Sequence, residues 1–334
     1  WVDNKHHNCM DVGITYNSFA FKKMLPEERE LKATSFAIGR HLQKLGHHVR
    51  YFDMDNPEDI KSLCADKPQV VFDTCERIHD DPRGESYTAA LLEFLRIPHT
   101  RTNSFQIALG INKVRVKLLL EYYHIPIPRF QVFHSGDDEL RPDLPFPLFV
   151  KGIASENSIG IDEHSLVTNT RELKQQVEKI NTVLKQPALV EEFIGGREFS
   201  VAVLPGITNC ALPIMEIEFD DLPPNKRYLD YKAKWITRSD QYKRTVPVYP
   251  VNLPEDEQNL ISSTALKCFN ILGLDSYARI DMRYNDRTPY VLEVNQNPSI
   301  NENGSGYVHS CENHGMDYED MIVALLDNAV RGEL

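Results

Sequence analysis

Charged and amide side chains alternate with apolar residues in two segments near the end of the chain. In the segment YVLEVNQNP, Glu293 and Asn295 are two positions apart, so a strand presents both on one face. The segment ARIDMRY presents Arg279 and Asp281 in the same way. If the two strands pair, they gather two carboxylates and an amide, which are hard oxygen ligands that suit Mg²⁺ better than zinc. Each residue alone would be an ordinary solvated position, but together Asp281, Glu293 and Asn295 predict a magnesium site. Because Mg²⁺ is usually shared with substrate phosphates, the site is expected to bind a nucleotide.

Three lysines stand where they could meet the phosphates of such a nucleotide. Lys113 begins a predicted helix, Lys151 ends the apolar strand FPLFV, and Lys234 lies in the basic segment YLDYKAKW. Each would more often be a surface lysine, but ATP phosphates need point charges of this kind. A hinge for adenine and ribose would come from the segment LVEEFIGGRE, although this pattern alone is weak. It supplies Glu191, Glu192, Phe193, Ile194 and Glu198.

The composition is that of a globular protein with an acidic balance. The 334 residues are 41% apolar and 26% charged, and the formal net charge is -12. This balance argues against nucleic acid as a bulk partner, although a few local lysines are enough for a phosphate ligand. No uninterrupted apolar run approaches the roughly 18 residues of a membrane span, so no membrane partner is expected.

The N-terminus and the cysteines predict where such a protein works. The first eleven residues, WVDNKHHNCMD, have neither an apolar core nor a small-residue cleavage site, so no signal peptide is expected. The missing initiator Met indicates that the true start lies elsewhere. The six cysteines are scattered without a C-x-x-C motif, which is typical of a reducing compartment and not of a disulfide or zinc framework. We therefore expect a cytoplasmic protein.

The order of predicted elements divides the chain into three parts. Residues 1–110 alternate short apolar strands with helices, the pattern of a doubly wound parallel sheet of the α/β class. Residues 111–195 combine strands with one amphipathic helix, and residues 196–334 contain long strands such as CALPIMEIEF. These two parts predict an α+β C-terminal half. A long, polar, basic segment at about 220–246 is predicted to be a functional lid, because such segments inside a compact domain are seldom only structural.

The chain resembles the ATP-grasp ligases, and most nearly the D-alanine–D-alanine ligases, in a series of ordered segments. These are KVRVKLLLEYYHIPIPRF, FPLFVKG, LVEEFIGGREFSV, YLDYKAKW, ARIDMRY and YVLEVNQNP. PEEREL and RGESYTAALLEFLRIPHT extend the resemblance over nearly the whole chain. It implies an ATP-grasp fold with an N-terminal α/β domain, and ATP held between the antiparallel sheets of a central small domain and a C-terminal domain. It also implies a homodimer formed through the N-terminal domain.

By matching positions, the resemblance implies a role for each candidate residue. The ATP-binding set would be the phosphate-binding lysines Lys113 and Lys151, the adenine-amine acceptor Glu191, its neighbours Glu192, Phe193 and Ile194, the ribose ligand Glu198, and the γ-phosphate lysine Lys234. The cofactors would be ATP and two Mg²⁺ ions, with Mn²⁺ as an alternative, on the ligands Asp281, Glu293 and Asn295. The remaining catalytic set would be Arg279, which steadies an oxyanion and a substrate carboxylate, Glu28, which holds an ammonium, and Ser158 in the phosphate loop.

The sequence departs from the family pattern where amino acids, and not ATP, should bind. The departures fall at the substrate-triad serine (Asn157), the lid tyrosine (Trp235), the glycine after NQNP (Ser299), the carboxylate-binding serine (Gly304, followed by Ser305) and the N-terminal glycine pair (Gly13). Only Glu28 then remains of the triad that links the lid to the N-terminal domain, and a tryptophan cannot accept a hydrogen bond as a tyrosine does. We expect the chemistry to be retained and the substrate to differ.

These features predict an ATP-dependent carboxylate–amine ligase that joins small amino-acid-like substrates through an acyl phosphate, releasing ADP and phosphate. The lid around Lys234 would exclude water from the acyl phosphate. One alternative is a genuine D-alanine–D-alanine ligase of cell-wall synthesis, in which Asn157 and Trp235 are drift. Another is a catalytically inactive ATP-binding regulator, which the intact charged residues, such as Lys151, Arg279 and Glu293, argue against.

Overall fold

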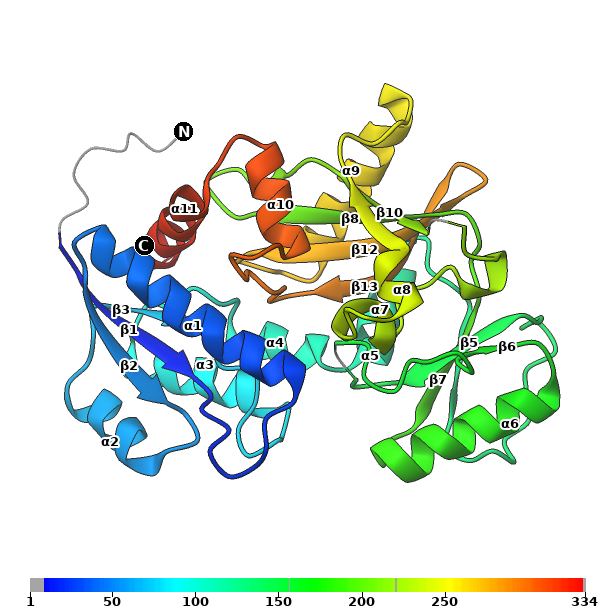
Figure 1. Ribbon diagram of the computed structural model, residues 1–334, viewed down its shortest axis with the longest axis horizontal. Coiled ribbons are helices and arrows are strands. Elements are labelled where there is room, and N and C mark those ends of the chain that lie inside the picture. Colours follow the sequence, from blue (N-terminus) through cyan, green and yellow to red (C-terminus); the bar gives the residue numbers. More distant parts are fainter. Residues whose placement is uncertain (1–8, 156, 220, 333–334) are drawn as a thin grey trace.

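The structure, a computed structural model, describes residues 9–155, 157–219 and 221–332. The segment in which no signal peptide is expected lies mostly outside the described residues, as do position 156 in the predicted phosphate loop and position 220 at the start of the predicted lid. Three sheets organise the described chain (Figure 1). Among the described residues, no helix combines the length and apolar character that a membrane crossing requires.

Strands and helices follow one another in the order that Figure 1 labels. The strands are β1 (Asp11–Tyr16), β2 (His48–Asp53), β3 (Val70–Asp73), β4 (Phe130–Phe133), β5 (Leu148–Gly152), β6 (Leu166–Val167), β7 (Ala188–Glu192), β8 (Arg197–Leu204), β9 (Cys210–Ala211), β10 (Met215–Phe219), β11 (Thr245–Val248), β12 (Ala278–Asn285) and β13 (Thr288–Asn295). The α-helices are α1 (Pro26–Lys44), α2 (Pro57–Ala65), α3 (Gly84–Leu95), α4 (Ser104–Gly110), α5 (Lys113–Tyr122), α6 (Thr170–Lys179), α7 (Tyr231–Trp235), α8 (Asp240–Lys243), α9 (Glu255–Ile271), α10 (Gly306–Asn313) and α11 (Tyr318–Arg331).

The N-terminal sheet is parallel, in the order β2-β1-β3, and carries helices on both faces. Val12 and Ile14 of β1 pack with α1 and α11 on one face, whereas Phe52 and Val71 pack with α2 and α3 on the other. Burial on both faces explains why these strands read as nearly continuous apolar runs. This sheet confirms the predicted doubly wound α/β pattern.

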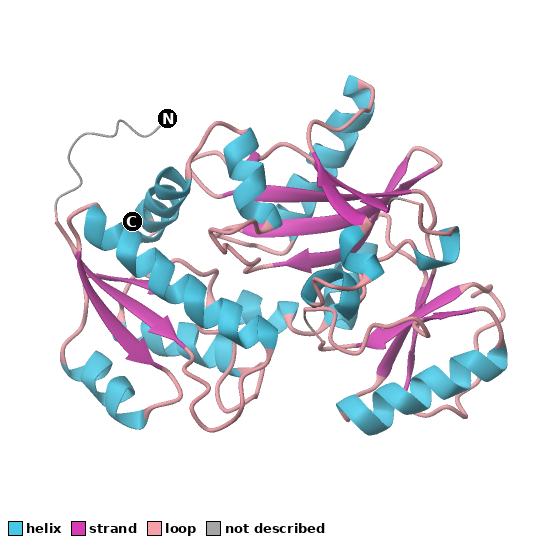
Figure 2. Cartoon of the chain, in the orientation of Figure 1, coloured by secondary structure: helices cyan, strands magenta, loops and turns pink. Residues whose placement is uncertain are grey.

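The central sheet is antiparallel, in the order β4-β7-β5-β6, and α6 covers one face of it (Figure 2). Leu148 and Val150 of β5 face α6 in the core, together with Val190 of β7. Because side chains alternate along a strand, the opposite face carries Lys151 of β5 and Glu191 of β7. The polar face of the small sheet is therefore turned away from its own core.

The C-terminal sheet is antiparallel, in the order β11-β10-β8-β12-β13, with β9 beside β8. Its buried face packs against α5 and α9 through residues such as Phe199, Ile280 and Met282. The alternate positions of β8 and β12 point to the other side of the sheet. They are Glu198, Ser200, Arg279, Asp281 and Arg283. One period-two pattern thus supplies both the core and a polar surface.

A β-bulge sets which residues of β13 reach that surface. Glu293 pairs with Asp281, but Val291 pairs with Met282, so Leu292 is an extra residue on β13. Without it, Val291 and Glu293 would face the same side. The bulge lets Val291 enter the core while Glu293 faces the polar side, as Asn295 does two positions on.

Some predicted elements differ from the observed ones. The single strand expected over CALPIMEIEF is wrong, because Pro213 cannot donate to the ladder and separates β9 from β10. The segment predicted as a lid contains α7, α8 and part of β11. The predicted boundaries near 110 and 195 fall between the three sheets, but α11 packs with α1 and β3 at the other end of the chain. The division into three domains therefore stays a prediction.

Candidate active site

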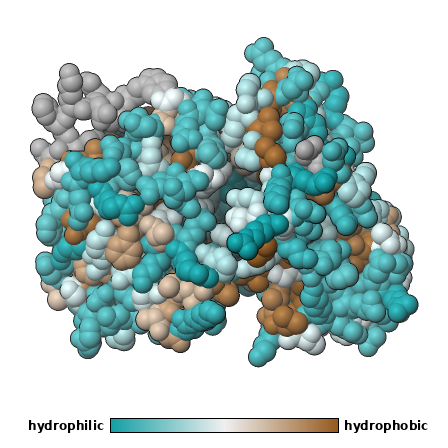
Figure 3. Space-filling view, in the orientation of Figure 1, coloured by the Kyte–Doolittle hydropathy of each residue, from teal (hydrophilic) through white to brown (hydrophobic). Residues whose placement is uncertain are grey.

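A cavity of about 510 Å³ lies between the polar faces of the central and C-terminal sheets. The space-filling view shows the surface hollowed between the half of the molecule that carries α1 and the half that carries α7 (Figure 3). With the exception of Glu28, every site residue predicted from the sequence lines this cavity. They are Lys113, Lys151, Asn157, Ser158, Glu191, Glu192, Phe193, Ile194, Glu198, Lys234, Trp235, Arg279, Asp281, Glu293, Asn295, Ser299, Gly304 and Ser305.

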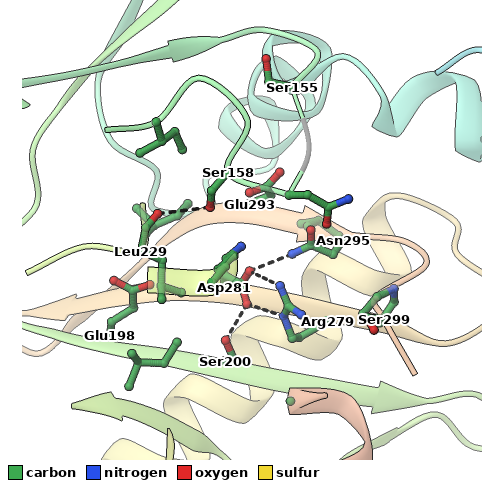
Figure 4. A pocket seen from close by; sticks show the side chains of 18 of the residues that line it. Ser155, Ser158, Glu198, Ser200, Leu229, Arg279, Asp281, Glu293, Asn295 and Ser299 are labelled. Carbon is green, nitrogen blue, oxygen red and sulfur yellow. Dashed lines mark hydrogen bonds and ion pairs between the residues drawn. The ribbon is translucent and has the colours of Figure 1, made fainter. Parts of the chain in front are cut away.

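The predicted metal ligands lie side by side on β12 and β13. Asp281 Oδ1 accepts hydrogen bonds from Ser200 Oγ at 2.6 Å and Arg279 Nε at 2.8 Å. Asp281 Oδ2 accepts from Arg279 Nη2 at 2.9 Å and Asn295 Nδ2 at 2.8 Å (Figure 4). Both oxygens are therefore engaged, and a cation bound at Asp281 would displace some of these donors.

These three side chains suit Mg²⁺, which takes only part of its ligands from protein, better than a metal ion that protein side chains coordinate completely. No group of three or more His, Cys, Asp or Glu side chains in the described part of the chain is placed to hold a metal ion. Asp281 and Glu293 pair across β12 and β13, with Asn295 next to them. Two carboxylates and one amide match the partial coordination that Mg²⁺ takes from proteins, with phosphates and waters completing the shell.

Three lysines from separate parts of the chain converge on Glu293. Lys113 forms an ion pair with it at the start of α5, where Asn112 Oδ1 caps the helix. Burial by itself would raise the pKa of Glu293, but the charges of Lys113, Lys151 and Lys234 outweigh it and hold the pKa at about 2. These lysines come from α5, β5 and α7, so folding alone brings them together.

Lys234 lines the cavity, where the carboxylates of Asp281, Glu293 and Glu198 lie near its ammonium. Asp230 caps α7 by accepting from the Ala233 N–H at 2.7 Å, which fixes the helix that carries Lys234. Its ammonium forms no ion pair with any residue that the structure describes. Burial, together with the charge of Arg279, lowers the pKa of Lys234. An incoming anion would relieve this repulsion.

A lysine that the sequence analysis missed shares the carboxylate of Glu191. Lys117 Nζ lies 2.5 Å from Glu191 Oε1, and Lys151 Nζ lies 2.7 Å from Oε2, with all three side chains buried. Burial favours the neutral acid, but the two lysines lower the pKa of Glu191 overall. Lys117 is four residues after Lys113 on α5, and that spacing could have revealed it. Glu191 keeps a second lone pair on each oxygen for a ligand.

One end of the cavity is apolar and suits a flat ring. Phe193 stacks with Phe149 at a centroid distance of 6.4 Å, and the Arg283 guanidinium lies 5.6 Å from the Phe193 ring. Arg283 also pairs with Glu198 at 2.6 Å, and burial raises the pKa of Glu198 in spite of this partner. In Figure 4, Glu198 and Ser299 lie at opposite ends of a row of side chains that line the cavity, with Asp281 between them.

The outer hinge residue Glu192 is held by another partner. Arg129 binds both of its oxygens, at 2.8 and 3.1 Å, and this pairing lowers the pKa of Glu192. The Glu192 N–H donates to the Arg129 carbonyl at 2.8 Å. The Glu192 side chain is therefore engaged by Arg129.

The two departures from the family triad contact each other. Trp235 donates from Nε1 to the Asn157 carbonyl at 2.9 Å, and Ser158 Oγ donates to the Leu229 carbonyl at 3.2 Å. Asn157 and Ser158 both have left-handed backbone, with φ of 54° and 57°. Non-glycine residues rarely adopt this conformation, and such strain concentrates at binding sites. The lid and the phosphate loop are therefore joined through a backbone acceptor.

Glu28 is the predicted site residue that the structure places elsewhere. It is 1% exposed, accepts from the Leu25 N–H at 2.8 Å as part of the helix cap, and pairs with Lys22 at 2.7 Å. These contacts turn its carboxylate into the protein and away from the cavity. Its neighbours on α1 are placed differently: Glu30 lines the cavity, and the buried Glu27 accepts from Tyr231 Oη at 3.0 Å.

Known proteins resemble this chain over most of its length. A family model described as D-ala D-ala ligase C-terminus matches residues 119–327. D-alanine--D-alanine ligase B of Chromobacterium violaceum is 30% identical over 90% of this chain and 93% of its own length. The D-alanine--D-alanine ligase of Aquifex aeolicus is 29% identical over 90% and 96%, and the uncharacterized protein y4sG of Sinorhizobium fredii is 31% identical over 78% and 75%.

Solved structures agree on the fold. The D-alanine--D-alanine ligase of Bacillus anthracis matches with a TM-score of 0.79 and 22% identity over 97% of this chain and 98% of its own. The same ligase complexed with ATP matches with a TM-score of 0.75 and 20% identity over the same shares. Because the family model covers more than half of the chain and the fold agrees throughout, the chain belongs to the D-alanine–D-alanine ligase family and is an ATP-dependent carbon–nitrogen ligase with the ATP-grasp fold.

Proposed function

We propose that this protein joins the carboxylate of one small amino-acid-like substrate to the amine of another, with conversion of ATP to ADP and phosphate. One observation supports this function above all others: Lys113, Lys151 and Lys234 converge on Glu293 at the wall of a cavity large enough for a nucleotide. Cations interleaved with carboxylates match a triphosphate and its divalent metal. The relatives named D-alanine--D-alanine ligases support the same reaction class.

ATP would lie along the row of residues between Glu198 and Ser299. The apolar slot at Phe193 would take the adenine, Glu198 would bind the ribose, and the lysines would hold the phosphates. The two amino-acid substrates would then occupy the end marked by Ser299, Gly304 and Ser305. The segment 220–246 would close over this end as a lid.

A carboxylate reacts poorly with an amine, because its oxygen is a poor leaving group. ATP supplies the chemistry by converting the carboxylate into an acyl phosphate, which an amine attacks with loss of phosphate. Mg²⁺, held by Asp281, Glu293 and Asn295, would neutralise phosphate charge. Lys234 would bind the transferred phosphoryl group, and Arg279, released from Asp281, would stabilise the oxyanion of the tetrahedral intermediate. Trp235 and Asn157 would keep the lid closed against water.

A genuine D-alanine–D-alanine ligase is the second candidate. The printed names of the relatives favour it. The replacement of two triad positions by Asn157 and Trp235, and the orientation of Glu28 away from the cavity, argue against it. A catalytically inactive regulator is less consistent with the charged site, because a buried cation such as Lys234, whose pKa is lowered by burial, is costly to keep where no anionic ligand binds.

A matrix of substrates tests the proposal. Pairs of D- and L-amino acids are supplied with ATP and Mg²⁺, ADP release is followed continuously, and the products are identified by mass spectrometry. We expect at least one pair to give amide and ADP in equal amounts. Glu293→Gln should lower kcat by about 100-fold or more, because the metal site loses a charged ligand. The exposed Glu139→Gln is the matched control and should keep full activity.

Three results would decide among the candidates. Preference for a pair of D-alanines would establish the second candidate. Absence of ADP release with every pair, despite tight ATP binding, would favour the regulator. Near-normal turnover of Glu293→Gln would contradict the metal assignment.

A further inference from the structure

A small acidic recess extends the cavity beneath the lid. It has a volume of about 40 Å³ and lies between α1, the end of β3 and the loop after β13. Three carboxylates line it, from Glu27, Glu30 and Glu76. Trp235 and Asn297 line both this recess and the main cavity, so the two spaces are continuous. Nothing in the proposed roles of ATP or Mg²⁺ uses this recess.

Two buried acceptor atoms in the recess have no donor. Glu27 is 4% exposed; its Oε2 accepts from Tyr231 Oη, but its Oε1 has no hydrogen-bond partner among the described residues. Asn297 donates from Nδ2 to Glu85. Its Oδ1 is also buried and has no hydrogen-bond partner in the part of the chain that the structure describes. Leaving such buried atoms unpaired is unfavourable, because they have lost their hydrogen bonds to water. Glu27 Oε1 and Asn297 Oδ1 are both hydrogen-bond acceptors, so a ligand that pairs with them must carry a hydrogen-bond donor.

Two of the three carboxylates, Glu27 and Glu30, also lack a directly paired cation among the described residues. Glu30 accepts a weak hydrogen bond from Ser299 Oγ at 3.4 Å. Burial, together with the negative charge of Glu76, raises the pKa of Glu30. A bound cation would remove this repulsion, as a carboxylate or a neutral methyl group would not.

The cations that surround the recess are already engaged. Arg101 lines it, but Glu85 and Asp73 hold its guanidinium, the second at 3.7 Å. Arg77 lies 3.7 Å from Glu76 at the rim. The protein's own charges therefore leave the recess with a net negative potential.

We propose that this recess binds the side-chain ammonium of a diamino carboxylic acid, so that one substrate is a basic amino acid. The inference rests on the proposed ligase function. The recess has room for on the order of three waters, which suits a primary ammonium and its adjacent methylene better than a planar guanidinium. The indole of Trp235 adds an aromatic ring, the type that attracts cations most strongly. The side chain of alanine carries no donor for these carboxylates.

Calorimetry on the whole chain tests the inference without requiring turnover. The protein is saturated with Mg²⁺ and a non-hydrolysable ATP analogue and then titrated with matched pairs that differ only in the terminal amine. The pairs are 2,4-diaminobutyrate with 2-aminobutyrate, ornithine with norvaline, and lysine with norleucine, in both D and L forms. We expect about a 10-fold or greater preference for the diamino member of at least one pair. Equal or weaker binding of the diamino member in every pair overturns the inference.

Variants identify the recess as the source of the preference. Glu30→Gln and Glu76→Gln each remove one negative charge and should each reduce the preference by about 5-fold or more. Glu139→Gln, an exposed change of the same kind, should leave it unaltered. Retained binding of the ATP analogue shows that each variant is folded. An unchanged preference in both folded variants would place the ammonium elsewhere and overturn the assignment.

The same panel separates this inference from the ligase function. If ornithine binds more tightly than norvaline but no pair yields an amide, the proposed ligase function fails and the recess assignment holds. If neutral amino acids are joined and the terminal amine gives no advantage, the ligase function holds and the recess assignment fails.

Discussion

At the scale of single residues, Glu293 is where the charges of the cavity meet, and its titration is measurable. Three lysines hold its pKa at about 2, below the ordinary value of about 4.3 for an unfolded chain. Because the pKa of Glu293 is lower in the folded protein, its ionised form adds to the free energy of unfolding. This contribution is fully present above about pH 4.3 and is lost as the pH falls toward 2. The difference in unfolding free energy between wild type and Glu293→Gln should therefore be constant above about pH 5 and shift against the wild type below it.

Urea denaturation of both proteins from pH 7 down to pH 2.5 measures this difference. Glutamine does not titrate, so the subtraction isolates Glu293 from the other carboxylates. A difference that does not change with pH, or that moves in favour of the wild type on acidification, would contradict the convergence of the lysines.

The sequence predicted residues of this kind best where alternation along a strand fixes the direction of a side chain. Asp281, Glu293 and Asn295 were predicted as one cluster and lie together. Glu28 was predicted with the same site but does not line the cavity, because successive residues of a helix point about 100° apart and the sequence does not say which direction faces a cavity. Lys117 was missed because its partner, Glu191, lies on a strand that is distant in the sequence.

At the scale of elements, the lid is tied to the N-terminal helix by a bond that the family resemblance did not suggest. Tyr231 of α7 donates to Glu27 of α1 at 3.0 Å. Tyr231→Phe removes this bond and should let water enter more often. We expect the ratio of amide to ADP to fall by a few-fold, because hydrolysis of the acyl phosphate competes with amine attack.

The measurement compares product and ADP from the same reaction. Tyr122→Phe, at a position that is 75% exposed, is the control and should keep the ratio at its wild-type value. A coupling ratio that Tyr231→Phe leaves intact would show that this bond does not keep the lid closed.

Local patterns predicted most elements but not their irregularities. The strand YVLEVNQNP was predicted, whereas the bulge at Leu292 was not, because a single extra residue becomes visible only through its partner strand. The polarity of the segment 220–246 predicted a lid. The short helices α7 and α8 inside it depend on caps, Asp230 and Ser239, that are ordinary loop residues in the sequence.

At the scale of the whole molecule, the last helix joins the two ends of the chain. Leu325 of α11 is 1% exposed in a core that contains Val12 and Ile14 of β1 together with Ala202 of β8. Leu325→Ala should cost about 2–5 kcal/mol. It should lower the hydrogen-exchange protection of β1 and of β8 together, because both pack in this core.

Hydrogen exchange with mass spectrometry measures both strands in one experiment. Loss of protection in one strand alone would mean that the shared core does not couple them. The position of α11 against the first strand is a contact over about 300 residues that no local pattern encodes.

The central claim is that the cavity transfers a phosphoryl group from ATP to a substrate carboxylate. An amino acid labelled with ¹⁸O in its carboxylate tests this directly, with the most active substrate pair. The account predicts that each amide formed is accompanied by one phosphate that carries ¹⁸O, since the carboxylate oxygen leaves with the phosphoryl group. Amide formation with unlabelled phosphate would contradict it.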